Sequence, residues 1–290
     1  MRSVYYSFQL KKTIGMARGN KNKRKISGPS MADKAEKHIL YEAAVQCAES
    51  EIDFVDDIFQ KLSNRQASKL REDFCGTTNS SCEWVRRRES NKAYCVDLDP
   101  EVLNWGKEHH IATLTEEQQE RINIHTADVM DSGVSSMDIV LAMNFSYWIF
   151  KDRVTMVKYF RSVYDSLVDD GVFFLDSFGG YEAFKEMEES TRHDGFTYVW
   201  DQSFYNPITG DGLFHIHFKF KDGSRINKAF SYDWRVWTLP EIREMLSEAG
   251  FKAAVYWEGE DEDGDGNGEF EATLDGEADA GWIAYIVAQK

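Results

Sequence analysis

The feature that most constrains the fold is a strand, turn, helix and second strand between residues 69 and 97. KLREDFC runs into a polar turn, and SSCEWVRRR has the spacing of a helix. KAYCVDLD is a second apolar strand, and Pro100 follows it as if in the first turn of the helix PEVLNWGKEHH. This order predicts a βαβ unit, in which the two strands are parallel.

The same alternation continues through the first half of the chain. Helical patterns fill residues 31–62, where apolar residues recur every three or four positions. RINIHTADVMD and the long apolar segment MDIVLAMNFSYWIF are predicted strands, and an amphipathic helix then runs to Gly171 before the strand VFFLDSFGG. Alternating strands and helices make a parallel sheet that is covered on both faces.

The pattern changes after Gly180. YEAFKEMEES is predicted as a short helix, and two strands around NPITGDG form a hairpin with RINKAFSYDWRVW as a third antiparallel strand. TLPEIREMLSEAG is a helix with Thr238 as its N-cap and Gly250 as its stop, and a pair of strands around an acidic loop closes the chain. We therefore expect an antiparallel insert at about residues 182–236.

The turn after the first strand has the features of a cofactor site. Gly76 allows backbone amides to approach a ligand closely, and Asp97 ends the second strand 21 residues later. An acidic residue at that place can bind both hydroxyls of a ribose. The pattern indicates a cofactor that contains adenosine.

These residues resemble the first two motifs of the class I S-adenosylmethionine-dependent methyltransferases. In that alignment Glu72 takes the acidic position, and Phe74, Gly76 and Thr78 occupy the places of three glycines. Two glycines are therefore replaced, which leaves the path of the turn open. Thr77 and Thr78 would present hydroxyls to the carboxylate or the amino group of the cofactor.

The resemblance extends in order from about Leu70 to Ser177 and implies further contacts. Asp97 would bind the ribose, with Leu98 as an adenine contact beside it. Asp128 would bond the adenine amino group, and Val129 would pack on the ring. The segment that contains Asn144 resembles the fourth-strand motif, and we expect Asn144 to contact the cofactor.

With this resemblance we predict one Rossmann-like α/β domain over residues 31–290. Its doubly wound, seven-stranded sheet is mostly parallel and has a C-terminal antiparallel strand pair. An N-terminal helical lid and the antiparallel insert would cover the substrate. The implied reaction is transfer of a methyl group from S-adenosylmethionine to a small molecule.

Aromatic residues and Arg235 suggest the acceptor. Rings suit a cationic amine, and Arg235 could bind a substrate carboxylate. The expected acceptor is thus the amine nitrogen of a zwitterionic metabolite, which resembles the substrates of glycine- and sarcosine-type enzymes. The expected catalytic residues are Tyr147, Asp176 and His215. The expected substrate contacts are Tyr147, Trp148, Phe178, Tyr181, Trp200, Tyr232 and Arg235.

Two other functions stay open. One is a protein or peptide methyltransferase, and the other is a non-catalytic member that binds the cofactor and acts through a protein partner. The second follows from the replaced glycines. A DNA amino-methyltransferase is rejected because NFSY lacks both prolines of the motif that such enzymes carry at this place.

Charge and cysteine content limit the partners and the compartment. The net charge is −16, although residues 1–27 carry eight basic residues and no acidic one. The rest of the chain is therefore strongly acidic and repels the phosphate backbone of a nucleic acid, which argues against a nucleic-acid substrate. Four cysteines without a CxxC pair suggest reduced thiols in a cytoplasmic protein, and no apolar run approaches the length of a membrane span. A homo-oligomer stays open.

The basic segment at residues 1–30 is expected to be a disordered extension, with organelle targeting as the alternative. His215 and His217 have the spacing of a metal pair, but no third ligand is identifiable, so no metal is predicted. DEDGDGNGEFEA imitates a calcium loop through Asp261, Asp263 and Asp265. Ala272 occupies the position that needs a bidentate Glu, so a solvated acidic loop is expected.

Overall fold

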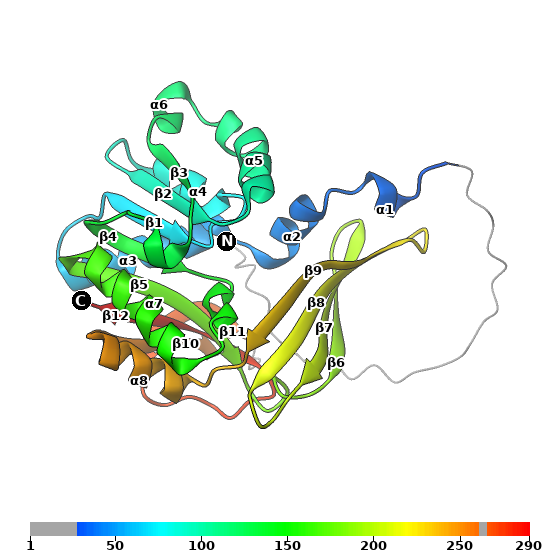
Figure 1. Ribbon diagram of the computed structural model, residues 1–290. Coiled ribbons are helices and arrows are strands. Elements are labelled where there is room, and N and C mark those ends of the chain that lie inside the picture. Colours follow the sequence, from blue (N-terminus) through cyan, green and yellow to red (C-terminus); the bar gives the residue numbers. More distant parts are fainter. Residues whose placement is uncertain (1–27, 261–265) are drawn as a thin grey trace.

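The computed structural model describes residues 28–260 and 266–290 and has a mixed eight-stranded sheet at its centre (Figure 1). The strand order is β11-β10-β12-β5-β4-β1-β2-β3. The five strands from β5 to β3 are parallel, and β12, β10 and β11 add antiparallel pairs. The strands are β1 (Lys69–Asp73), β2 (Lys92–Asp97), β3 (Ile122–Thr126), β4 (Met137–Ala142), β5 (Leu167–Gly179), β10 (Lys252–Glu260), β11 (Gly266–Thr273) and β12 (Trp282–Gln289).

The fold class is confirmed, and the sheet gains one strand. The prediction of seven strands missed β11, which lies in the segment that we expected to be a loop. β11 pairs antiparallel with β10 at the edge of the sheet, and its Phe270 packs against Phe54 and Tyr285. Backbone pairing with β10 and the half-buried Phe270 ring thus hold an otherwise polar edge strand. The calcium-like positions 261, 263 and 265 lie outside the described residues.

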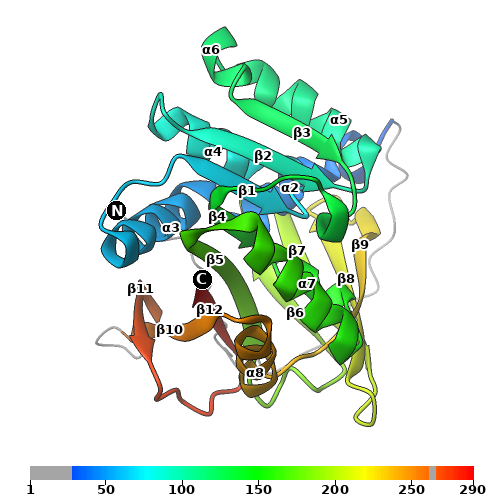
Figure 2. The ribbon, with the colours of Figure 1, turned by 60° about the vertical axis from the view of Figure 1, so that its left-hand side comes forward.

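Helices cover both faces of this sheet (Figure 2). α3, α4 and α5 pack over one core, and α7 and α8 pack over the other. Residues along β4 alternate between the two cores, as a doubly wound sheet requires. The helices are α3 (Ala48–Ser63), α4 (Asn79–Arg87), α5 (Pro100–His109), α6 (Glu116–Gln119), α7 (Arg153–Ser166) and α8 (Leu239–Ala249), with short 3-10 turns η1 (Ile111–Thr113), η2 (Val129–Asp131) and η3 (Ser146–Ile149).

Two predicted boundaries are wrong in an informative way. The helix expected to reach Gly171 ends at Ser166, because Leu167 is already extended and begins β5. The long strand expected at residues 137–150 ends at Ala142, and the chain then turns into η3. The predicted stop of α8 at Gly250 is confirmed, with Thr238 as the N-cap.

The insert is a separate four-stranded antiparallel sheet in the order β6-β7-β8-β9. Its strands are β6 (Met187–Arg192), β7 (Phe196–Tyr205), β8 (Asp211–Phe220) and β9 (Arg225–Arg235). The helix predicted over residues 181–190 is wrong, because its second half is β6. The regular pairing of β6 with β7 satisfies backbone groups that a short polar helix would leave to water.

The first two helices, α1 (Met31–Lys34) and α2 (Lys37–Val45), bridge the insert and the main sheet (Figure 1). Ser30 caps α1, and the Met31 N–H donates to Asp222 Oδ2 at 2.8 Å at the turn between β8 and β9. Residues 1–27, on which most of the predicted extension falls, lie outside the described residues. Among the helices of the described residues, none has the length and apolar character that crossing a membrane needs.

A buried ion pair lies at the carboxyl end of β1. The Arg71 guanidinium is 2.8 Å from the Asp73 carboxylate, and both side chains are almost fully buried. The Tyr159 hydroxyl also donates to Asp73 at 2.9 Å, and Arg71 donates to the Val134 carbonyl at 3.2 Å. The ion pair thus ties β1 to α7 and to the segment before β4.

We expect Arg71→Met to lower the free energy of unfolding by about 3–5 kcal/mol, because it leaves the Asp73 carboxylate buried without its cation. Arg71→Met combined with Asp73→Asn should recover most of that loss, since the Asn side chain still accepts from Tyr159. Urea denaturation followed by circular dichroism measures both. An equal loss in the single and the double variant would show that the charge is not the cause.

Candidate active site

The turn between β1 and α4 has a left-handed backbone at three alternate positions. The φ angles are 57° at Phe74, 51° at Gly76 and 63° at Thr78. These are the three places at which the resembling family has glycine, the residue that takes such angles without strain. The chain therefore follows a glycine-type turn even where it carries Phe and Thr, which answers the question that the sequence left open.

The backbone angle alone does not require glycine at position 76. Phe74 and Thr78 show that this turn tolerates side chains in the left-handed region, at a cost of about 1–2 kcal/mol each. A Cβ atom added at Gly76 would meet nothing within 4 Å, so open space lies in front of its Cα. Such a place suits a ligand that approaches the backbone closely.

Asp97 connects the end of β2 to this turn. Its Oδ2 accepts the Gly76 N–H at 2.9 Å, and its Oδ1 accepts the Asp99 N–H at 2.9 Å. Each carboxylate oxygen has a second lone pair, and the half-buried side chain stays within reach of solvent. Leu98 beside it is 67% exposed, so an apolar side chain is available to a flat ring at this edge.

Three other predicted cofactor residues make contacts within the protein. Glu72 accepts the Ser81 N–H at 3.0 Å and also the Ser81 hydroxyl, and burial raises the pKa of its carboxyl to about 8. The Thr77 hydroxyl donates to Glu42 at 2.6 Å, and the fully buried Thr78 hydroxyl lies against Cys82. The expectation that these hydroxyls face the cofactor is therefore corrected, because α2 and α4 engage them.

Asp128 and Val129 lie where β3 ends, at the same edge as Asp97. Asp128 is exposed, and its Oδ1 accepts the Met130 N–H at 2.9 Å to cap η2. Val129 is buried in the core beside α7. Asp128 thus keeps one oxygen for a ligand, whereas Val129 offers little surface.

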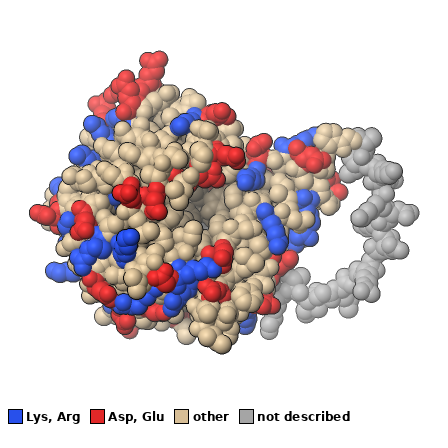
Figure 3. All heavy atoms as spheres, viewed as in Figure 1, with Lys and Arg blue, Asp and Glu red and all other residues tan. Residues whose placement is uncertain are grey.

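A cavity of about 640 Å³ opens beside this edge, between the main sheet, the lid helix α2 and the insert. The surface of the molecule is visibly hollowed between its two sheets (Figure 3). α2 contributes Tyr41 and Ala44, and α3 contributes Glu51, whose carboxylate accepts the Ser80 hydroxyl at 3.2 Å in the first turn of α4. This hydrogen bond links the cavity wall to α4, the helix that follows the turn of Gly76.

Asn144 and Asp176 lie together in this cavity. Asn144 and Phe145 both have a left-handed backbone, with φ angles of 58° and 59°. Their N–H groups donate to Asp176 Oδ2 and Oδ1, each at 2.8 Å. Burial raises the pKa of the Asp176 carboxyl to about 7, although the two N–H donors oppose this shift. A carboxylate that titrates near neutral pH can accept a proton from a bound molecule.

Aromatic residues from β5 and the insert form much of the remaining surface. Phe178, Tyr181, Trp200 and Tyr232, all predicted as substrate contacts, line the cavity. Trp234 lies beside them, and its ring stacks on Tyr232 with centroids 4.3 Å apart. These rings present π faces that attract a cation.

Three predicted site residues do not reach the cavity. Tyr147 and Trp148 are fully buried, and the Tyr147 hydroxyl donates to the Asp176 carbonyl at 2.8 Å. Burial holds the pKa of the Tyr147 hydroxyl far above its usual range, so the hydroxyl stays protonated and cannot serve as the proton acceptor. Arg235 pairs with Glu241 at 3.1 Å and stacks on Trp237 at 3.6 Å. These residues support the fold around the cavity, and the roles expected for them are corrected.

His215 lies on the opposite face of the insert from the cavity. Successive residues of β8 point to alternate faces, and Ile216 lines the cavity. The His215 Nδ1 instead pairs with the Ser231 hydroxyl at 2.8 Å. His215 therefore cannot act as the predicted catalytic base.

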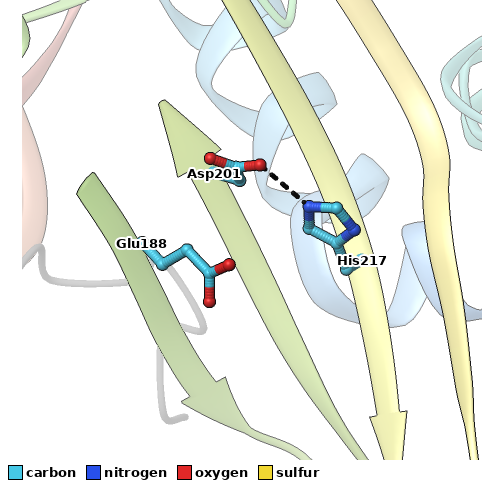
Figure 4. Close-up of side chains that lie close together, drawn as sticks. All are labelled: Glu188, Asp201 and His217. Carbon is cyan, nitrogen blue, oxygen red and sulfur yellow. Dashed lines mark hydrogen bonds and ion pairs between the residues drawn. The ribbon is translucent and has the colours of Figure 1, made fainter. Parts of the chain in front are cut away.

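Glu188, Asp201 and His217 lie close together on this face of the insert, opposite the cavity (Figure 4). Their side chains are of the types that bind metal ions. The His217 Nδ1 accepts the Lys228 N–H at 2.9 Å, so its proton is on Nε2, which donates to Asp201 at 3.1 Å. A metal at Nε2 would require the loss of that proton. His217 and Asp201 are therefore linked by a hydrogen bond, whereas Glu188 pairs with Lys219 at 3.4 Å.

Sequence reasoning missed several residues of the cavity. Glu51 is buried on the apolar side of α3, at helical spacing from Val55 and Ile58, and an acid at such a position was the available signal. Trp257 and Glu258 at the end of β10 had no comparable signal, because only the pairing of β10 with β12 brings them beside β5.

Comparisons with known proteins agree with this architecture. Neither a protein-family model nor a curated protein sequence matches the chain. Solved structures do match, among them an S-adenosylmethionine-dependent methyltransferase from Clostridium acetobutylicum, with TM-score 0.66 and 16% identity over 87% of this chain and 96% of that one. Two others are an amino pentose methyltransferase from Micromonospora echinaspora (TM-score 0.62, 16% identity, 87% and 95% covered) and a sugar N-methyltransferase from a Streptoalloteichus species (TM-score 0.59, 17% identity, 95% and 99% covered). The chain therefore has the class I methyltransferase fold.

We expect Gly76→Ala to fold but to lose most of its affinity for an adenosine-containing cofactor. The added methyl group costs about 1–2 kcal/mol through the left-handed backbone, and it projects into the open space in front of the turn. Thermal denaturation should show a small drop in Tm, and calorimetry should show at least tenfold weaker binding. Gly195→Ala is the matched control, because Gly195 also has a left-handed φ of 89° and no neighbour within 4 Å. Equal cofactor affinity in both variants would contradict the assignment.

Proposed function

We propose that this protein transfers a methyl group from S-adenosylmethionine to an amine nitrogen of a small molecule. The observation that carries the proposal is the aromatic cavity with Asp176 inside it, at the same carboxyl edge of the sheet as the turn of Gly76 and Asp97. A methyl donor in that turn and an acceptor in the cavity would meet at the carboxyl edge of β1 and β4. The methyltransferase fold supports the same pairing.

The residues present fit the cofactor. Asp97 keeps lone pairs for the ribose hydroxyls, exposed Leu98 can pack on the adenine, and Asp128 keeps an oxygen for the adenine amino group. Gly76 leaves room for the part of the cofactor that joins the ribose. When bound, S-adenosylmethionine supplies a methyl group on a positively charged sulfur, which keeps the bonding electrons as the methyl leaves.

The cavity supports a small acceptor with an amine. The lid helix α2 and the insert enclose it, which suits a molecule that is surrounded by protein. Its aromatic rings favour a cation, and two structural neighbours are described as an amino pentose methyltransferase and a sugar N-methyltransferase. The zwitterionic acceptor expected from the sequence relied on Arg235 for its carboxylate, and Arg235 is engaged by Glu241.

Asp176 is the residue that we assign to proton transfer. An ammonium group has no lone pair, so it must lose a proton before its nitrogen can attack the methyl carbon. The Asp176 carboxylate accepts that proton, and its pKa of about 7 lets it do so near neutral pH. The N–H groups of Asn144 and Phe145 hold the carboxylate in place.

Calorimetric titration with S-adenosylmethionine and S-adenosylhomocysteine tests the proposal directly. We expect both to bind in a one-to-one ratio. Binding of neither ligand to the folded protein would exclude the methyltransferase function, whereas binding without turnover of any amine would favour a non-catalytic role.

Asp97→Ala should weaken the binding of both ligands by about 1–3 kcal/mol, because the ribose hydroxyls lose a charged acceptor. Asp99→Ala, two residues away and at the N-cap of α5, is the control for local damage to the helix. If Asp97→Ala binds as tightly as the unaltered protein, the ribose assignment is wrong.

The pH dependence of kcat should follow the ionisation of the Asp176 carboxyl group. The active form is the carboxylate, so kcat should fall tenfold per pH unit below about pH 7 and level off above it. Asp176→Asn should lower kcat by about 10²–10⁴-fold and remove this acid limb. Asp169→Asn, an exposed change on the same strand, should leave the profile unchanged. An unshifted acid limb in Asp176→Asn would assign the proton transfer to another group.

A further inference from the structure

The cavity has a strongly one-sided charge. Six carboxylates line it, from Glu51, Asp176, Glu189, Glu258, Glu260 and Asp279. Among the described residues that line it there is no Lys, Arg or His. Carboxylates that surround a cavity with low-dielectric walls attract cations and repel anions.

Two cations of the described residues that neighbour cavity-lining residues are engaged in ion pairs. Arg235 pairs with Glu241, and Lys185, whose ammonium lies over the Tyr181 ring, pairs with Glu182 at 2.9 Å. Neither is available to a substrate carboxylate without breaking its own ion pair. An acceptor that carries a carboxylate would therefore lose its water shell without gaining a partner.

The carboxylates of Glu260 and Asp279 lie within 4.8 Å of each other, whereas those of Asp176 and Glu258 belong to separate strands of the sheet. Asp176 on β5 lies opposite Tyr285 on β12, and two residues further along β5 Phe178 lies opposite Ile283. On the other side of β12, Ala284 lies opposite Trp257, the residue before Glu258 on β10. Asp176 and Glu258 are separated by two strand-to-strand distances across the sheet and by two residues along a strand. Their Cα atoms are therefore about 12 Å apart. The side chains of Phe178 and Ile283 line the cavity between them.

Asp176 and Glu258 are thus two acidic groups with an apolar surface between them. Tyr232, Trp200 and Trp234 add π faces near Asp176, and Trp257 and Trp282 lie near Glu258 with ring centroids 5.1 Å apart. A molecule with two positive nitrogens joined by an apolar chain is complementary to it. One nitrogen would lie at Asp176, and the other at Glu258.

We propose that the methyl acceptor is a net-cationic diamine or polyamine without a carboxylate, whose second ammonium binds at Glu258. This inference rests on the proposed methyl transfer and names its substrate class. Glu258 is a specificity-determining residue in this assignment, since it contacts the far end of the acceptor and not the reacting nitrogen.

The test compares acceptors that differ only at the far end. The purified full-length protein is given S-adenosylmethionine and, in turn, 1,5-diaminopentane, pentylamine or 6-aminohexanoate, and methylated product is measured by mass spectrometry. We expect the diamine to exceed pentylamine by about tenfold or more in kcat/KM, and 6-aminohexanoate to be the poorest. Equal or better turnover of 6-aminohexanoate would overturn the inference and leave the methyl transfer standing.

The variant Glu258→Gln then tests whether Glu258 is the residue that favours the diamine. It should raise KM for the diamine about tenfold and leave KM for pentylamine and the affinity for S-adenosylhomocysteine unchanged. Glu269→Gln removes the same charge from the neighbouring strand, outside the cavity, and should change neither. An equal effect of the two variants on the diamine would show that only the overall charge matters and would overturn the assignment of Glu258.

If none of the three amines is methylated, measuring their binding tests the proposed substrate class. Calorimetry in the presence of S-adenosylhomocysteine should show that the diamine binds and 6-aminohexanoate does not. If neither binds while S-adenosylhomocysteine does, the substrate class is wrong and the cofactor site stands. Failure of S-adenosylhomocysteine itself to bind identifies a failure of the proposed function.

Discussion

Two carboxylates that accept backbone N–H groups from left-handed turns hold the functional edge of this protein together. Asp97 accepts from Gly76, and Asp176 accepts from Asn144 and Phe145. A non-glycine residue in the left-handed region costs about 1–2 kcal/mol, and hydrogen bonds to a charged acceptor are strong enough to offset it. Because β1, β2, β4 and β5 are parallel, the turns that follow them meet at the same edge of the sheet. The strained left-handed residues and the hydrogen bonds that stabilise them therefore lie at the edge where a ligand would bind.

The character of the cavity arises from parts of the chain that are distant in sequence. The lid brings Tyr41 and α3 brings Glu51, the insert brings Trp200 and Tyr232, and β10 brings Glu258. No one of these segments forms a site alone. The parallel half of the sheet carries the turn of Gly76 and Asp97, whereas α2, the insert and the antiparallel strands supply much of the cavity lining.

Some predictions succeeded because they rested on local patterns. The unit from β1 to β2 and the caps of α8 follow from a few adjacent residues, and the structure has both. The errors came where pairing with a distant strand outweighed local preference. The polar segment of β6 looks helical by itself but pairs with β7, and the acidic segment of β11 looks like a loop but packs Phe270 against Tyr285. Tyr147 and Trp148 were expected in the site, but the left-handed turn at Asn144 and Phe145 directs them into the core.

The sequence by itself determined the α/β architecture, the position of the single glycine between two strands and the acid that ends the second strand. Hydrophobic periodicity and capping residues act over a few positions, so these features are readable in the chain. Only the tertiary structure decided that Arg235 forms an ion pair with Glu241 and that His215 faces away from the cavity. It also decided that six carboxylates line the cavity, with no cation among the described lining residues. Which face a strand residue occupies, and which charge meets which, depends on strand register and on sheet packing over long separations, and no local pattern encodes either.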